Sequence, residues 1–206
     1  RYNRRMTENT QSSLKKRWVI APLIPNDVKQ ALKDYPPFLR QLLFNRGITD
    51  ASSARAYLGE GSPTPTDPFL MLGMREAVQA IEQALQEGKN ITVYGDYDTD
   101  GVTASSLLFE FFSQLGSEPR VYIPNRFDEG YGLNLEAIDL LAAEGTHLLI
   151  TVDCGIRSIN EVRRAKELGM RVIITDHHQP GDSLPPADAV INPHQPGDPY
   201  PYKELA

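Results

Sequence analysis

The sequence has very little cysteine and no long apolar run. Its 206 residues include one cysteine, Cys154, which cannot form a disulfide within the chain. No apolar stretch reaches the roughly 18 residues that a membrane helix needs, and no apolar segment typical of a secretory signal opens the chain. These absences argue against a disulfide-built secreted domain. They predict no membrane partner and a reducing, cytoplasmic location.

Common cofactor and catalytic motifs are also missing. The sequence has no G-x-G-x-x-G for a dinucleotide and no G-x-x-x-x-G-K-[ST] for a nucleoside triphosphate. It also lacks the G-x-S-x-G of serine hydrolases. We therefore expect no nucleotide cofactor. Cofactor-based redox chemistry, P-loop ATP hydrolysis and serine hydrolysis all lose their usual support.

Positive charge is scarce outside the first 17 residues. The net charge is −6, and residues 1–17 hold six bases and one acid, so the remaining residues hold 15 bases and 26 acids. This balance argues against a general nucleic-acid coat. A polyanionic substrate would have to be attracted locally, by bound metals and a few arginines.

The pattern of apolar residues predicts three regions. Residues 1–16 are polar and predict a disordered tail, and residues 17–88 predict a small helical region that packs on the core. From residue 89 to 206, strands alternate with helices, which is typical of parallel α/β folds. The fold class is thus α/β, with an open, mainly parallel five-stranded sheet and flanking helices. The expected strands are 91–94, 120–123, 147–152, 171–175 and 188–191, and the expected helices are 102–115, 134–143 and 157–168.

Acidic residues and histidines follow three of these strands where each strand ends. The groups are Gly95–Gly101 with three aspartates, Asp153 within Val152–Gly155, and Asp176 with His177 and His178. The carboxyl ends of parallel strands form one edge of a sheet, where ligands bind. Three such clusters at one edge predict a site for hard divalent metals.

The spacing of Asp96, Asp98 and Asp100 suits cation binding, because short carboxylates on a tight turn can converge. An EF-hand is the rival interpretation, but its position 12 would be Leu107 and a strand-like segment precedes the loop. A turn that only caps the next helix is the structural alternative. Capping needs one acid, whereas three acids repel one another unless a cation is present.

Asp153 could bridge two metals, as in two-metal phosphoryl transfer, or cap the helix that follows it. Imidazole favours manganese, iron or zinc over magnesium. One histidine of the pair can ligate while its neighbour points at a phosphate oxygen or leaving group. Asp96 and Asp176 could be ligands, or partners that orient a histidine or hold a water.

Four further residues are candidates for binding substrate. Arg126 could bind a phosphate through its forked guanidinium, and Tyr131 could stack on a base. Ser105 could help the start of the next helix hold an anion, with a core or capping role as the alternative. His194, after the last strand, could face metal or substrate.

The three motifs resemble those of the DHH phosphoesterase superfamily. These are Gly95–Gly101, Val152–Gly155 and Thr175–His178. Flanking segments, among them Leu42–Thr49, Asp67–Leu70 and Asn125–Asn134, are similar to its RecJ-type exonucleases. The resemblance implies a two-metal phosphodiesterase, using Mn²⁺ or Mg²⁺, that degrades single-stranded DNA in the 5′→3′ direction to 5′-mononucleotides in DNA repair and recombination. Other repair or recombination proteins would be its partners.

Carried onto this sequence, the resemblance implies metal ligands at Asp98, Asp100, Asp153 and His177. It implies that His178 contacts the scissile phosphate or aids the leaving group, with Asp176 and Asp96 as further catalytic residues. Some relatives, notably family II pyrophosphatases, have a ligating histidine where this chain has Tyr94, which weakens a pyrophosphatase interpretation.

The resemblance also implies that a fourth metal motif and a second domain lie beyond Ala206. Two alternative functions remain open. One is a phosphodiesterase for short oligonucleotides or cyclic dinucleotides, and the other is a non-catalytic DNA-binding scaffold with the same fold.

Overall fold

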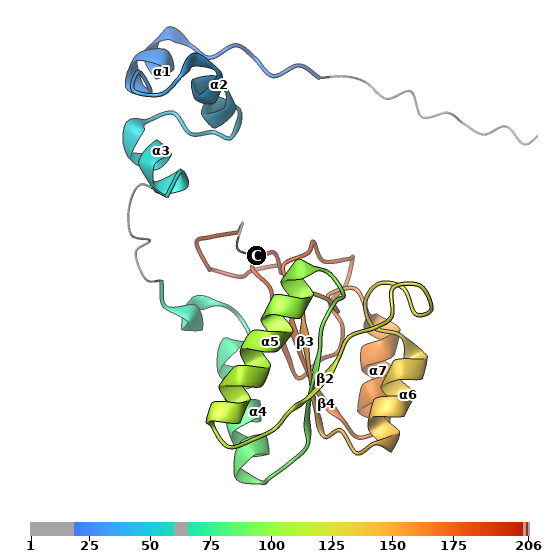
Figure 1. The fold of residues 1–206 in the computed structure, drawn as a ribbon. Helices are drawn as coiled ribbons and strands as arrows, with labels where there is room; N and C mark the ends of the chain where they lie inside the picture. The colour runs from blue at the N-terminus through green and yellow to red at the C-terminus, as the bar shows by residue number, and fades with distance from the viewer. Residues whose placement is uncertain (1–18, 60–65, 204, 206) are drawn as a thin grey trace, which may run out of the picture. The chain divides into compact units, whose positions relative to one another are not determined.

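The computed structural model describes residues 19–59, 66–203 and 205. The chain divides between residues 65 and 66 into two compact units, a small helical unit and a larger α/β unit (Figure 1). The tail predicted over residues 1–16 lies outside the described residues.

The first unit contains three short helices. They are α1 (Asn26–Ala31), α2 (Pro37–Asn45) and α3 (Ala51–Tyr57). Leu32, Leu43 and Ala54 form the centre of its small apolar core. The carboxylate of Asp50 caps α3 by accepting hydrogen bonds from the backbone N–H groups of Ser52 and Ser53.

The second unit contains a five-stranded parallel sheet, which confirms the predicted fold class. Its strands are β1 (Ile91–Tyr94), β2 (Arg120–Tyr122), β3 (Leu148–Val152), β4 (Arg171–Thr175) and β5 (Ala189–Ile191). Their order across the sheet is β2-β1-β3-β4-β5, and every neighbouring pair is parallel. The helices of this unit are η1 (Pro68–Leu70), α4 (Met74–Gln86), α5 (Thr99–Gln114), α6 (Leu135–Ala143) and α7 (Ile159–Glu167).

Helices cover both faces of the sheet (Figure 1). Side chains alternate along each strand, so Val93 and Ile150 belong to a core with α4 and α5, whereas Leu149 and Val172 belong to a core with α6 and α7. Burial of β1 and β3 on both faces explains why these strands are mostly apolar in the sequence.

The strand order reverses between β1 and β3, and this reversal positions the site. The chain moves from β1 to β2 on one side, then returns to place β3 on the other side of β1. Tyr94 pairs with Thr151, and Val152 pairs with Thr175, so the three strands end almost level. A crevice between outgoing loops at such a point is the usual ligand site of an open α/β sheet.

Helix α4 belongs to the sheet unit, although the sequence analysis grouped it with the helical region up to residue 88. Gly73, at φ +80°, lies so close to β5 that a Cβ there would be 2.3 Å from the carbonyl oxygen of Val190. The neighbouring N–H of Leu72 donates to the Asp198 carboxylate. The sheet unit therefore begins before α4, while the prediction of further elements beyond residue 206 stays a prediction.

Helix α5 begins at Thr99, three residues before the predicted start at residue 102. Asp98 is its N-cap, and its Oδ1 accepts hydrogen bonds from the N–H groups of Asp100 and Gly101. Asp100 therefore lies in the first helical turn rather than on an open loop beside Asp98. Among the described residues, none of the helices is both long enough and apolar enough to cross a membrane.

We expect Gly101→Ala to destabilise the sheet unit by about 2–3 kcal/mol, because the methyl group overpacks a site enclosed by backbone. A Cβ at Gly101 would be 2.4–2.7 Å from the backbone O, N and C atoms of Asp96. Urea unfolding measures the change. Gly181→Ala is the control, since its nearest atom would be 4.0 Å away. Equal stability of the two variants would contradict this close packing.

Candidate metal centre

Residues from the three predicted clusters lie together at the carboxyl ends of β1, β3 and β4. Asp96, Asp98 and Asp153 form one group whose ligand atoms all lie within 4.8 Å of one another. Asp153, His177 and His178 form a second group by the same measure. Asp153 belongs to both groups, so its carboxylate occupies the centre of the site.

Asp98 is held by the start of α5. The N–H of Gly101 and, to a lesser degree, that of Asp100 bind its carboxylate and hold its pKa below the usual range. The side chain is exposed, and only Oδ1 accepts these cap bonds. Capping and metal binding are therefore compatible, because Oδ2 remains for a cation.

Asp96 belongs to the segment Gly95–Gly101, here called the Asp loop, and only 2% of its surface is exposed. Its backbone packs directly on Gly101, where a side chain would not fit. Burial raises the pKa of its carboxyl group. Among the described residues, its Oδ1 has no hydrogen-bond partner.

Asp153 has a left-handed backbone, with φ at +61°, and is the only non-glycine residue with positive φ in the described chain. Such a conformation costs of order 1 kcal/mol or more and occurs often at functional sites. Two hydrogen bonds hold the turn that follows β3. The Asp153 N–H donates to the Thr175 carbonyl, and the Thr151 hydroxyl donates to the Cys154 carbonyl. The strained turn aims a carboxylate at the site, and Asp153 does not cap α7.

Burial raises the pKa of Asp153 to about 6, and the neighbouring Asp98 carboxylate adds to this, whereas a hydrogen bond with His177 opposes it. The Nε2 of His177 lies 2.8 Å from Asp153 Oδ1, while the second oxygen, Oδ2, is buried and has no partner among the described residues. Because this pKa rises from 3.8 to about 6 on folding, the metal-free chain loses stability as the pH rises from 3.8 to about 6.

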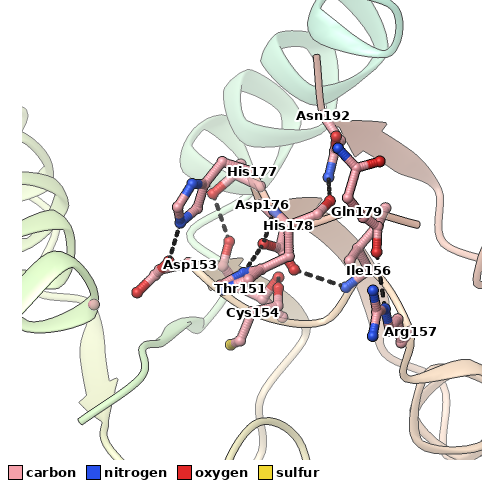
Figure 2. Close-up of polar contacts among 12 residues, drawn as sticks. Thr151, Asp153, Cys154, Ile156, Arg157, Asp176, His177, His178, Gln179 and Asn192 are labelled. Atoms are coloured by element: carbon pink, nitrogen blue, oxygen red, sulfur yellow. Dashed lines mark hydrogen bonds and ion pairs between the residues drawn. The ribbon is translucent and has the colours of Figure 1, made fainter. Parts of the chain in front are cut away.

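Asp176 orients His178 (Figure 2). Its Oδ1 lies 2.8 Å from His178 Nδ1 and accepts the His178 backbone N–H at 3.0 Å. Its Oδ2 accepts the N–H of Ile156, so this buried carboxylate also ties the β3 and β4 loops together. A proton on Nδ1 satisfies the pair and leaves Nε2 of His178 for a ligand.

Asp100 is absent from both groups of possible metal ligands among the described residues. It lines a cavity of about 560 Å³ together with Asp153, His177 and the α5 residue Leu107. Because α5 begins at Thr99, Asp100 is the second residue of this helix, two positions after its N-cap Asp98. Its predicted role as a ligand stays a prediction.

Asn192 also belongs to the site, although the sequence pattern did not predict it. Its side chain is fully buried, its Nδ2 donates to the His178 carbonyl at 2.9 Å, and its Oδ1 accepts the His194 N–H. Figure 2 shows this amide reaching from the end of β5 to the His178 backbone. A polar residue directly after the last strand was its only signal in the sequence.

The four predicted substrate-binding residues have different surroundings. Tyr131 is half exposed, and its hydroxyl lies 3.3 Å from His178 Nδ1. Arg126 lies over the Tyr97 ring, next to the Asp loop. Ser105 is buried against Gly95, with its Oγ unpartnered among the described residues, so its position favours the core alternative over direct substrate contact. His194 is held through its backbone by Asn192.

Tyr94, the last residue of β1, is not placed at the metal centre. Its ring is buried in the core with α6, and its hydroxyl donates to the Gly132 carbonyl at 3.0 Å. Cys154 is also buried, and burial raises the pKa of its thiol far above the usual value. Neither side chain is therefore placed to act as an anionic ligand.

The residues present fit divalent cations. Two buried carboxylate oxygens, Asp96 Oδ1 and Asp153 Oδ2, lack partners within the described chain, although buried polar groups nearly always have them. Asp98 adds a third carboxylate within 4.8 Å of these two, and His177 adds an imidazole whose Nε2 lies 2.8 Å from Asp153 Oδ1. Oxygen donors with one or two imidazoles suit Mn²⁺, and the carboxylates alone suit Mg²⁺.

The chain is similar to curated exonucleases of bacteria. It is 44% identical over 194 residues to the single-stranded-DNA-specific exonuclease RecJ of Bacillus subtilis, which covers 93% of this chain and 25% of that protein. It is 42% identical over 175 residues to the RecJ of Escherichia coli, with 84% of this chain and 30% of that protein covered. The chain thus spans about a quarter to a third of the length of these relatives.

Solved structures agree with the sequence comparison. An exonuclease RecJ bound to manganese matches with a TM-score of 0.60 and 41% identity, over 65% of this chain and 34% of that one. RecJ in complex with Mn²⁺ from Thermus thermophilus matches with a TM-score of 0.61 and 32% identity, over 89% of this chain and 26% of that one.

The family model for the "DHH family, N-terminal domain" matches residues 90–199, which include all three acid and histidine clusters. This range is more than half of the chain and coincides with the parallel sheet whose carboxyl ends form the candidate metal centre. On these grounds the chain belongs to the DHH family.

Proposed function

We propose that the intact protein is a metal-dependent exonuclease that hydrolyses single-stranded DNA in the 5′→3′ direction and releases 5′-mononucleotides. The observation that carries this proposal is the convergence of Asp96, Asp98, Asp153 and the two histidines at one switch point of the sheet. Membership of the DHH family and similarity to single-stranded-DNA-specific exonucleases supply the substrate class.

Asp98, Asp153 and His177 are the residues that would hold the cations, with Asp96 and Asp100 as further carboxylates. The chemistry that two dications supply is polarisation of phosphate oxygens and activation of a water. The role of the protein is to keep these carboxylates converged before any cation binds, and the α5 N-terminus and the strained Asp153 turn do so.

His178 is the residue proposed to face the scissile phosphate or the leaving oxygen. Asp176 binds its Nδ1 side, so Nε2 is the atom that can hold or deliver a proton. Asn192 and Tyr131 restrict the backbone and ring of the same residue. Partner repair or recombination proteins and a cytoplasmic location belong to the same proposal.

We expect Asp153→Asn to lower Mn²⁺-dependent hydrolysis of 5′-labelled single-stranded DNA by at least about 100-fold, because losing a group that holds or orients the metal typically costs 10–100-fold or more. Asp182→Asn is the control and should retain normal turnover, because Asp182 is exposed and belongs to neither set of possible metal ligands. Normal turnover by Asp153→Asn would refute the proposal. A strong preference for dinucleotides over long strands would favour the short-oligonucleotide alternative.

We also expect the apparent Mn²⁺ affinity to fall by about tenfold for each pH unit below pH 6. The reason is that a cation must displace the proton that Asp153 binds at a pKa of about 6 in the metal-free chain. Calorimetric titrations from pH 5 to 7.5 measure this dependence, and Asp182→Asn should follow the same curve. An affinity that stays constant over this range would show that Asp153 does not bind the metal.

A further inference from the structure

The segment between β2 and α6, residues 123–134, leaves the same carboxyl edge of the sheet and contains no helix or strand. It carries two candidate substrate-binding residues. Arg126 lies over the Tyr97 ring of the Asp loop, and the Tyr131 hydroxyl lies 3.4 Å from the Asp153 carbonyl. No strand pairing fixes this segment, so the position of both side chains depends on what closes the loop.

The carboxylate of Glu129 closes it. Its Oε2 accepts a hydrogen bond from the backbone N–H of Asn125 at 2.7 Å, near the start of the loop. Its Oε1 accepts hydrogen bonds from the Tyr122 hydroxyl and from Asn134 Nδ2, the latter at 3.2 Å. Asn134 is also the N-cap of α6, because its Oδ1 accepts the Ala137 N–H. One half-buried side chain thus connects the end of β2, the start of the loop and the start of α6.

These contacts require a carboxylate at residue 129. Hydrogen bonds from the Asn125 N–H and the Tyr122 hydroxyl hold the pKa of Glu129 below its usual range. Burial, with the Glu129 contact, raises the pKa of Tyr122 to about 12, so this hydroxyl remains a donor. An amide in place of the carboxylate would present an NH₂ group to one of the three donors, and that contact would be lost.

A negative charge in this loop does not favour DNA directly, because it repels phosphates. The neighbouring Asp128 carries the same charge, is exposed, and has no hydrogen bond or ion pair within the described chain. The two residues therefore differ in one respect, since only Glu129 closes the loop. Their comparison separates the effect of charge from the effect of loop closure.

We propose that Glu129 is a positioning residue for substrate binding, whose carboxylate holds Arg126 and Tyr131 in place beside the metal centre before a single strand binds. This inference rests on the proposed nuclease function, because it assigns DNA to these two side chains. Side chains that are already ordered lose less entropy on binding. Glu129 belongs to neither set of possible metal ligands, so its role is in binding DNA rather than in the chemical step.

Glu129→Gln in the intact protein tests this role with Mn²⁺ and 5′-labelled single-stranded DNA. The KM for DNA should rise by about 10-fold, since ordering two loop side chains costs this much. The kcat should stay within about twofold of the wild type, because binding is lost equally in the ground state and the transition state. The Mn²⁺ affinity should be unchanged, which a general loss of structure would not allow.

Asp128→Asn is the matched control, because it removes the same charge from the same loop. Its KM should equal that of the wild type or fall below it, since a charge that repels phosphates is lost. Opposite behaviour of the two variants supports the proposal. A KM for Glu129→Gln that is unchanged, or that falls as in Asp128→Asn, would overturn it.

Tyr122→Phe provides an independent test. It removes one donor to the same carboxylate and keeps the ring, whose centroid lies 5.0 Å from that of Tyr94. This variant should also raise the KM, and the double variant with Glu129→Gln should raise it no further than Glu129→Gln alone, because both changes act through one contact. Additive effects would contradict the proposal.

A direct binding measurement separates this inference from the nuclease proposal. Fluorescence anisotropy with a labelled oligothymidylate, whose phosphorothioate backbone resists hydrolysis, reports binding without cleavage. Weaker binding by Glu129→Gln than by Asp128→Asn, in a protein that cuts no DNA, would support the positioning role and contradict the nuclease function. DNA hydrolysis with the same KM in the wild type and Glu129→Gln would do the reverse.

Discussion

Electrostatic repulsion among three converging carboxylates is the constraint on which this structure depends. Carboxylate oxygens of Asp96, Asp98 and Asp153 lie within 4.8 Å of one another, and Asp96 and Asp153 are buried. This arrangement destabilises the metal-free fold, as the raised pKa values of Asp96 and Asp153 and the left-handed backbone of Asp153 indicate. A fold that accepts such costs at one edge of its sheet, with two carboxylate oxygens unpartnered, is organised around positive charge that binds there.

The backbone supplies the rigidity that holds these charges together. Gly95 and Gly101 let the Asp loop pack directly on α5, and parallel pairing keeps the ends of β1, β3 and β4 level. Asp176 and Asn192 extend this order to the histidines, through bonds to the His178 ring and backbone. Each functional side chain is thus positioned by regular secondary structure or a buried hydrogen bond, which preserves site geometry better than exposed loops do.

Apolar periodicity was enough to predict the α/β class, all five strands and the convergence of the three clusters. Strand order was not predictable, because it depends on which helices cover which face. The start of α5 was missed because Asp98 is both the cap of this helix and a candidate ligand, and the role of Asp100 as a ligand stays a prediction. The role of Asn192 was not predictable, since it arises from a buried hydrogen bond to the His178 backbone, on a different strand end.

Asp153 and His177 are proposed to share a cation at the carboxyl ends of β3 and β4. Pulsed electron paramagnetic resonance of bound Mn²⁺ tests it most directly, through the hyperfine coupling of an imidazole nitrogen to the metal. We expect a nitrogen coupling that disappears in His177→Gln and persists in His147→Gln, because His147 directly precedes β3 at the opposite edge of the sheet. A Mn²⁺ ion with no coupled nitrogen, or with coupling unchanged in His177→Gln, would contradict it.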